Sequence, residues 1–261
     1  MLSAKTLVAT LTTFSAMAMI SSAQTFVYEF DPQWAGGVKG AIKVNYPSPS
    51  DCPTKADISA NLDFSQVDVA ALKKIDGNCT TEPTAYKWHI HVKWNSTKTS
   101  DSLAQCSKVA TSNHYDPLLA CGPNSEFAET PACLPKIASY ACSPANYSAN
   151  PAVCEKGDLS GKIGDFKLDT HKQVSGQWTD DHYPLVSENT PQWNIILHAV
   201  CDNKATPRLA CALGKRTDDY GYGSDGKTPA YTPAATTPAP AVATPAPTYS
   251  HKGLKIKIGH F

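Results

Sequence analysis

The stretch "YKWHIHVKWN" (residues 86–95) places His89 and His91 two positions apart among aromatic residues. Aromatic and β-branched residues that alternate with polar ones predict a strand. Alternate side chains of a strand point to the same face, so the two histidines should stand side by side. Two imidazoles placed in this way can converge on one metal ion, but two solvent-facing histidines would have the same spacing.

Several other segments have the same strand-like pattern and are separated by turn residues, while no stretch keeps a helical period over a dozen residues. They are residues 25–30, 38–46, 58–68, 164–169 and 192–200. We therefore expect one all-β domain over residues 24–215, a Greek-key sandwich or barrel. Residues 115–153 are rich in Pro, Cys, Ser and Asn, and we expect a long connection pinned by disulfides.

The first 23 residues predict a secretory signal peptide, with Lys5 near the start, an apolar stretch and a cleavage site after Ala23. The apolar run is too short to predict a membrane span. We expect a secreted protein, extracellular or associated with a cell wall. In that setting the nine cysteines indicate disulfides, and three sequons predict N-glycosylation at Asn78, Asn95 and Asn146.

The charge balance excludes some partners. The chain has 23 basic and 23 acidic residues, and the predicted signal peptide removes only Lys5. This balance argues against a nucleic-acid binder and gives no overall charge that would attract membranes. Residues 216–261 turn to Gly and Ser, then to Thr and Pro, a composition that cannot build a core. We expect a disordered or weakly docked tail there.

Two more histidines lie where a metal would explain them. His198 lies in "WNIILHAVC" (193–201), a strand that should be buried on both faces, and His114 lies in the turn-like "TSNHYDP" (111–117). A buried histidine needs a partner for each ring nitrogen, and a metal with a hydrogen bond meets that need. Four imidazoles without cysteine suit copper or zinc. A zinc hydratase like carbonic anhydrase is one alternative, although it would leave His198 unused.

Five blocks, in order, resemble segments of the copper/zinc superoxide dismutases. The first block resembles the family's "FHVH", the second block resembles "GxHFNP", and the third resembles "VGDLGN". The fourth block resembles the family's last copper-ligand strand, and the fifth resembles "GxRxACGVIG". In this chain the blocks read "WHIHV" (88–92), "SNHYDP" (112–117), "KGDLSGKIG" (156–164), "IILHAV" (195–200) and "TPRLACALG" (206–214).

The resemblance implies roles for individual residues. Four histidines would be the copper ligands, namely His89, His91, His114 and His198. Cys106 and Cys211 would form a disulfide, and Arg208 would attract the superoxide anion beside the copper. Asp158 matches the aspartate of the family's zinc site.

The departures from the family are equally informative. No histidine occurs between Tyr115 and Thr170, and Glu155 stands where a zinc-site histidine should be, so a zinc site cannot be assembled. The segment between His198 and Arg208 is too short for the family's electrostatic loop. Both features resemble the secreted copper-only superoxide dismutases of fungi and oomycetes, in which "CExGDLSGK", here residues 154–162, is characteristic.

The resemblance implies a secreted enzyme that disproportionates superoxide with one copper and no zinc. A copper-binding or buffering protein with little turnover is the alternative from another class. Without zinc, we expect Asp158 to orient His114 by accepting a hydrogen bond from its far ring nitrogen, with Glu155 assisting at the open site. We also expect a monomer, and a disulfide between Cys121 and Cys154 that closes the long connection.

Overall fold

The computed structural model describes residues 23–47, 54–202 and 204–217. Residues 1–22 of the predicted signal peptide, Cys52 and the tail from residue 218 lie outside the described residues. The described chain is mostly β, with nine strands. The strands are β1 (Gln24–Phe30), β2 (Lys39–Tyr46), β3 (Ala56–Asp63), β4 (Ala85–His91), β5 (Ser100–Ser102), β6 (Phe166–Lys167), β7 (Gln173–Asp180), β8 (Asn194–Val200) and β9 (Arg208–Thr217).

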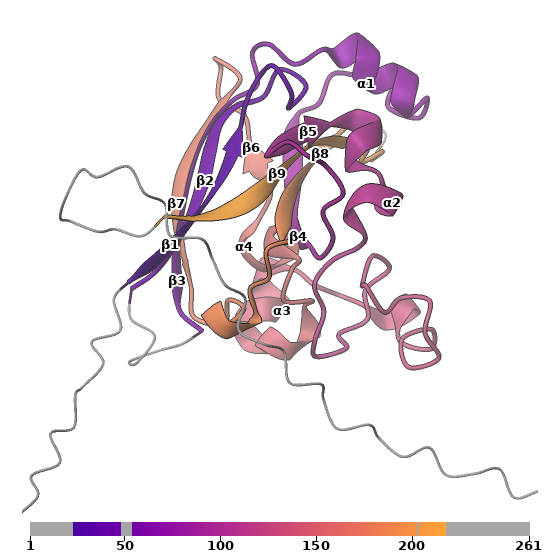
Figure 1. Ribbon diagram of the computed structural model, residues 1–261. Helices are drawn as coiled ribbons and strands as arrows, with labels where there is room; N and C mark the ends of the chain where they lie inside the picture. Colours follow the sequence, from indigo (N-terminus) through magenta and orange to yellow (C-terminus); the bar gives the residue numbers. More distant parts are fainter. Residues whose placement is uncertain (1–22, 48–53, 203, 218–261) are drawn as a thin grey trace, which may run out of the picture. The chain divides into compact units, whose positions relative to one another are not determined.

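The strands form an antiparallel, nearly closed barrel, which confirms the predicted all-β sandwich or barrel. Their order is β6-β4-β8-β9-β1-β2-β3-β7, and β5 pairs with β9. β9 joins the two halves because its first residues pair with β8 and its last residues with β1. Figure 1 shows β1, β2 and β7 to the left of β4 and β8, with α2 on the opposite side.

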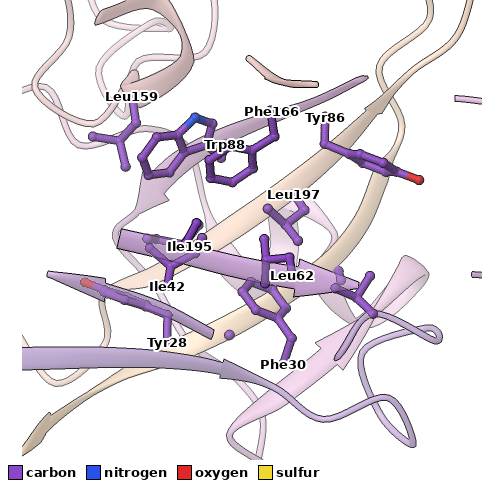
Figure 2. Close-up of a cluster of buried hydrophobic side chains, with 14 of the residues drawn as sticks. Tyr28, Phe30, Ile42, Leu62, Tyr86, Trp88, Leu159, Phe166, Ile195 and Leu197 are labelled. Carbon is purple, nitrogen blue, oxygen red and sulfur yellow. The ribbon is translucent and has the colours of Figure 1, made fainter. Parts of the chain in front are cut away.

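The core lies between two layers of strands, with β1, β2 and β3 in one layer and β4 and β8 in the other. Phe30, Ile42 and Leu62 come from one layer and meet Trp88 and Leu197 from the other, as Figure 2 shows. All five side chains are buried. Alternation along β4 turns Trp88 and Ile90 into this core, so its histidines face outward.

The outward face of β4 and β8 is covered by loops and short helices. The helices of the described chain are all short: α1 (Val69–Ile75), η1 (Leu103–Cys106), α2 (Lys108–Thr111), η2 (Ile137–Ser139), α3 (Pro144–Ala149), η3 (Pro151–Val153), α4 (Leu159–Ile163) and η4 (Val186–Glu188). A second apolar cluster of Ile196, Trp94 and the cysteines 106 and 211 packs on this face. None of the described helices has the length and apolar character needed to cross a bilayer.

Four disulfides cross-link the described chain. The predicted Cys106–Cys211 bond is confirmed. The expected Cys121–Cys154 bond is wrong, because the long connection is closed by two smaller loops instead. The other pairs are Cys79–Cys201, Cys121–Cys133 and Cys142–Cys154. In each of the last two pairs the cysteines are only 12 residues apart.

The strands differ from expectation in several places. β5 is not among the expected strand segments, and only Phe166 and Lys167 of the segment 164–169 form a strand. The segment 58–68 ends its strand at Asp63 and continues into α1. β7 and β9 were not among the expected strand segments, and β7 carries Gly176 in its middle, which weakens a strand pattern. The asparagines of the three sequons, Asn78, Asn95 and Asn146, are all exposed. Their glycosylation stays a prediction.

Candidate metal centre

The site is built on the outward face of β4. His89 and His91 point away from the core, and the loops above bury both side chains, at 6% and 0% exposure. His89 lies opposite Ile196 of β8, and His91 lies opposite Asn194. The spacing of two on one strand therefore brings the rings together, as expected from the pleat.

His198 reaches the same face because it follows the outward-facing Ile196 by two residues on β8. The pairing of β8 with β9 shifts register between Leu197 and His198, so that His198 lies opposite Arg208. Such bulges re-aim a side chain and are common beside active sites. The extra residue is Leu209 of β9, which packs in the core, so the bulge places Arg208 opposite His198 at the edge of the pocket.

His114 lies outside the named strands, immediately before the long connection, as its turn-like sequence predicted. Backbone bonds join Tyr115 to Ile90 of β4 and to Gly157. A Cβ at Gly157 would lie 2.7 Å from the Ile90 carbonyl oxygen, so only glycine permits this close approach. Buried Asp116 shapes the loop by accepting hydrogen bonds from the Ala120 and Cys121 amides.

These segments bring four imidazole rings together around one point. The ring centroids of neighbouring histidines are 4.1 Å apart for His89 and His114, and 4.9 Å apart for His91 and His114. One ring nitrogen from each of the four histidines lies within 4.8 Å of the others. These nitrogens could hold a metal ion.

The unsatisfied ring nitrogens support this interpretation. In the described part of the chain, four buried nitrogens lack a hydrogen-bond partner: Nδ1 of His89 and Nε2 of His91, His114 and His198. A buried polar atom without a partner is costly. Four such nitrogens in one cluster fit a metal that accepts all four lone pairs.

The opposite ring nitrogens are held by fixed acceptors. His91 Nδ1 lies 3.0 Å from the Ser112 carbonyl oxygen, and His198 Nδ1 lies 3.1 Å from the Thr206 carbonyl oxygen. Because a carbonyl only accepts, each Nδ1 carries the proton and each Nε2 is left free. The backbone thus selects the tautomer that a metal needs.

Glu155, not Asp158, orients His114. Glu155 Oε2 lies 2.6 Å from His114 Nδ1, so the expected hydrogen bond from His114 to Asp158 is wrong. Asp158 caps the N-terminus of α4 by accepting from the Gly161 amide, and this turns its carboxylate toward His89. Its Oδ1 lies 3.4 Å from His89 Nε2. The two carboxylates therefore face two different histidines.

The surroundings keep three of the four histidines neutral, namely His89, His91 and His198. Burial, followed by the charge of His114, lowers the pKa of His89 to about 4. Burial also lowers the pKa of His91 and His198 well below the usual value. Burial raises the pKa of Glu155, against the hydrogen bond from His114. Neutral imidazoles are the form that binds a metal.

Asp158 shows the opposite shift. Burial acts to raise its pKa, but the hydrogen bond and charge of His89, together with His114 and the Gly161 amide, outweigh burial and lower it. Asp158 therefore stays ionised beside the ring of His89.

Arg208 is fixed at the edge of the histidine cluster. Its guanidinium donates to the Cys106 carbonyl (3.0 Å), to Thr111 Oγ1 (2.7 Å) and to the Ser112 carbonyl (3.1 Å). Burial lowers its pKa to about 10, so it remains a cation near neutral pH. The disulfide of Cys106 with Cys211 of β9 holds these acceptors in place.

An open pocket of about 490 Å³ leads to this cluster. Three of the four histidines, two carboxylates, two cations and a tyrosine line this pocket. They are His89, His114, His198, Glu155, Asp158, Lys87, Arg208 and Tyr140. A small anion entering this pocket would meet Arg208 beside the histidine cluster.

Sequence reasoning missed several residues that hold the site. Ser112 and Thr206 act through backbone carbonyls, which leave no signal in side-chain identity. Tyr140 donates to Asp158 from the long connection, and only the position of that loop in space reveals it. Asp116 had one signal, since an Asp before Pro117 is typical of a structured turn.

A second cluster of metal-ligand types, Asp116 with Cys121 and Cys133, is not a comparable site because the two cysteines form a disulfide with each other.

Known protein families and curated protein sequences were also compared with the chain, and none matches it.

Proposed function

We propose that this chain is a secreted superoxide dismutase that uses one copper ion and no zinc. The observation that carries the proposal is the set of four buried imidazole nitrogens that face one another without hydrogen-bond partners. The ordered sequence blocks that resemble the copper/zinc superoxide dismutases coincide with the segments that form this cluster.

The donor set favours copper over zinc. Imidazole sites bind copper(II) more tightly than zinc, and no thiolate is present to favour a structural zinc site. A zinc hydratase needs three protein ligands and a position for water. Here the fourth imidazole nitrogen, on His198, would take that position.

The residues around the cluster fit the chemistry of superoxide. When bound, copper would supply the one-electron steps that oxidise one superoxide to dioxygen and reduce a second to hydrogen peroxide with two protons. Arg208 would hold the anion beside the histidines, since three fixed acceptors position its guanidinium. Glu155 would keep the proton on His114 Nδ1, so that His114 Nε2 can accept either the metal or a proton.

The test is the metal content of the natively secreted protein together with its rate of superoxide consumption. We expect one copper and no zinc per chain, and a rate that falls as salt increases. Arg208→Gln should slow the reaction about tenfold or more and flatten the salt dependence. Arg216→Gln, at an exposed position of β9, is the matched control and should leave both unchanged.

The other functions would give different results. Copper without superoxide consumption would indicate a copper-binding or buffering protein. Zinc without copper, combined with hydration of CO2, would support the hydratase and overturn the proposal.

A further inference from the structure

We propose that Tyr140 is a positioning residue that couples the two carboxylates beside the histidine cluster and tightens metal binding. This inference rests on the proposed metal centre but not on its reaction. Tyr140 belongs to the long connection, outside all five blocks that resemble the dismutases.

A single hydroxyl group links the two carboxylate-bearing residues. Tyr140 Oη donates to Asp158 Oδ2 at 2.8 Å and accepts from the backbone amide of Glu155 at 3.2 Å. Asp158 Oδ1 faces His89, and Glu155 Oε2 binds His114. One side chain therefore fixes the orientation of the groups behind two of the four histidines.

The ring of Tyr140 is itself held in place. A Cβ at Gly122 would lie 2.8 Å from Tyr140 Cε1 and would also collide with Glu155 Oε1, so the loop backbone packs directly on both groups. Two residues after Tyr140, the Cys142–Cys154 disulfide ties its loop to the residue that precedes Glu155. The hydroxyl cannot drift away from the carboxylates without breaking these contacts.

The hydrogen-bond directions suit a positioning role. Burial, followed by the charges of Asp158 and Glu155, raises the pKa of Tyr140, so its hydroxyl stays protonated and donates. The hydroxyl donates to Asp158 Oδ2, which leaves Asp158 Oδ1 directed at His89. The Gly161 amide also donates to Oδ1. Groups that orient metal ligands in this way typically change metal affinity 10- to 100-fold when removed.

The test uses Tyr140→Phe, which keeps the ring and removes the hydroxyl. We expect copper(II) affinity, measured on the full chain by competition with a chelator, to fall about tenfold. The electron paramagnetic resonance spectrum of bound copper(II) should also change, because the His89 ring loses its fixed orientation. Tyr147→Phe is the matched control, since Tyr147 hydrogen-bonds to Asp180 and lies outside the metal pocket.

A double-mutant cycle separates positioning from a loss of packing. If Tyr140 acts through Asp158, then Tyr140→Phe should have little further effect on copper affinity in an Asp158→Asn background. Additive effects, or wild-type affinity and spectrum in Tyr140→Phe, would overturn the inference. Both measurements need only bound copper. They decide the role of Tyr140 even where the wild-type protein fails to consume superoxide, which is the result that would overturn the proposed function.

Discussion

Ser112 supports the site through its backbone carbonyl rather than through its side chain. Its carbonyl accepts from both His91 and Arg208, and its backbone has φ 62° and ψ −149°, a conformation that suits glycine. The dismutase segment "GxHFNP" has glycine at the matching place. A residue other than glycine in such a conformation costs about 1–3 kcal/mol.

Replacing Ser112 with glycine should therefore stabilise the fold. Relief of backbone strain exceeds the added flexibility of the unfolded chain, which costs about 0.5–1 kcal/mol. We expect Ser112→Gly to raise the free energy of unfolding in urea by on the order of 1 kcal/mol. Ser107→Gly, in the same loop but with φ −61°, should not gain stability, and an equal gain there would contradict the strain argument.

Glu155 fixes the ring of His114 through a hydrogen bond with its Nδ1. Glu155→Gln keeps the size of the side chain but removes the charge opposite His114 Nδ1. We expect copper(II) affinity to fall 10- to 100-fold, measured by chelator competition. Glu129→Gln, at an exposed position, serves as the control, and unchanged affinity in Glu155→Gln would count against the orienting role.

At the scale of elements, α4 completes a strand that lacks a full-length neighbour. β6 pairs only with Ala85 and Tyr86 of β4. Beyond them, the backbone amide of Trp88 donates to Ser160 Oγ of α4 at 2.7 Å, and the Trp88 ring donates to the Gly164 carbonyl. The "GDLSGKIG" segment thus supplies the hydrogen bonds that a neighbouring strand would supply.

Removing the Ser160 hydroxyl should expose this dependence. Ser160→Ala leaves the buried Trp88 amide without a partner, which costs about 1–3 kcal/mol. Urea unfolding should report this loss, and copper affinity should fall as β4 loosens beneath His89. Ser175→Ala, on the exposed face of β7, is expected to change stability by less than about 0.5 kcal/mol.

For the whole molecule, the metal-free form should be sensitive to acid. Burial in the folded protein holds the pKa of His89 near 4, against 6.5 as the ordinary value, and also lowers those of His91 and His198. Between pH 6.5 and 4 these histidines bind protons in the unfolded chain but stay unprotonated in the folded chain. The free energy of unfolding therefore falls as pH falls. The raised pKa of Glu155 opposes this trend, but Glu155 is a single group and three histidines contribute to the loss of stability.

We expect the metal-free protein to lose on the order of 3 kcal/mol from His89 alone across this window. Urea unfolding at pH 7.5, 5.5 and 4.5 measures the loss, and saturating copper at pH 7.5 should raise the midpoint. His171→Gln, at an exposed histidine, should follow the wild-type profile. A metal-free protein with flat stability over this range would contradict the burial of neutral histidines.

How far the sequence predicts this molecule depends on whether a property is local. The pairing of His89 with His91 follows from strand alternation alone, and the ordered blocks pointed to His114, His198 and Arg208, which the structure brings beside that pair. The choice between Glu155 and Asp158 could not be predicted, because it depends on Asp158 being used as a helix cap. The disulfides of the long connection and the position of Tyr140 depend on how that loop packs.

β9 is the last described strand to be synthesised, and it completes both layers of the barrel. Arg208, Cys211 and the partner strand of β8 reach the fold only with this segment, whereas His89, His91 and His114 are made about a hundred residues earlier. In a chain exported from its N-terminal side, β8 with His198 therefore lacks its partner strand until β9 has crossed. For the secreted metalloprotein that we propose, the metal site would therefore be completed only after export.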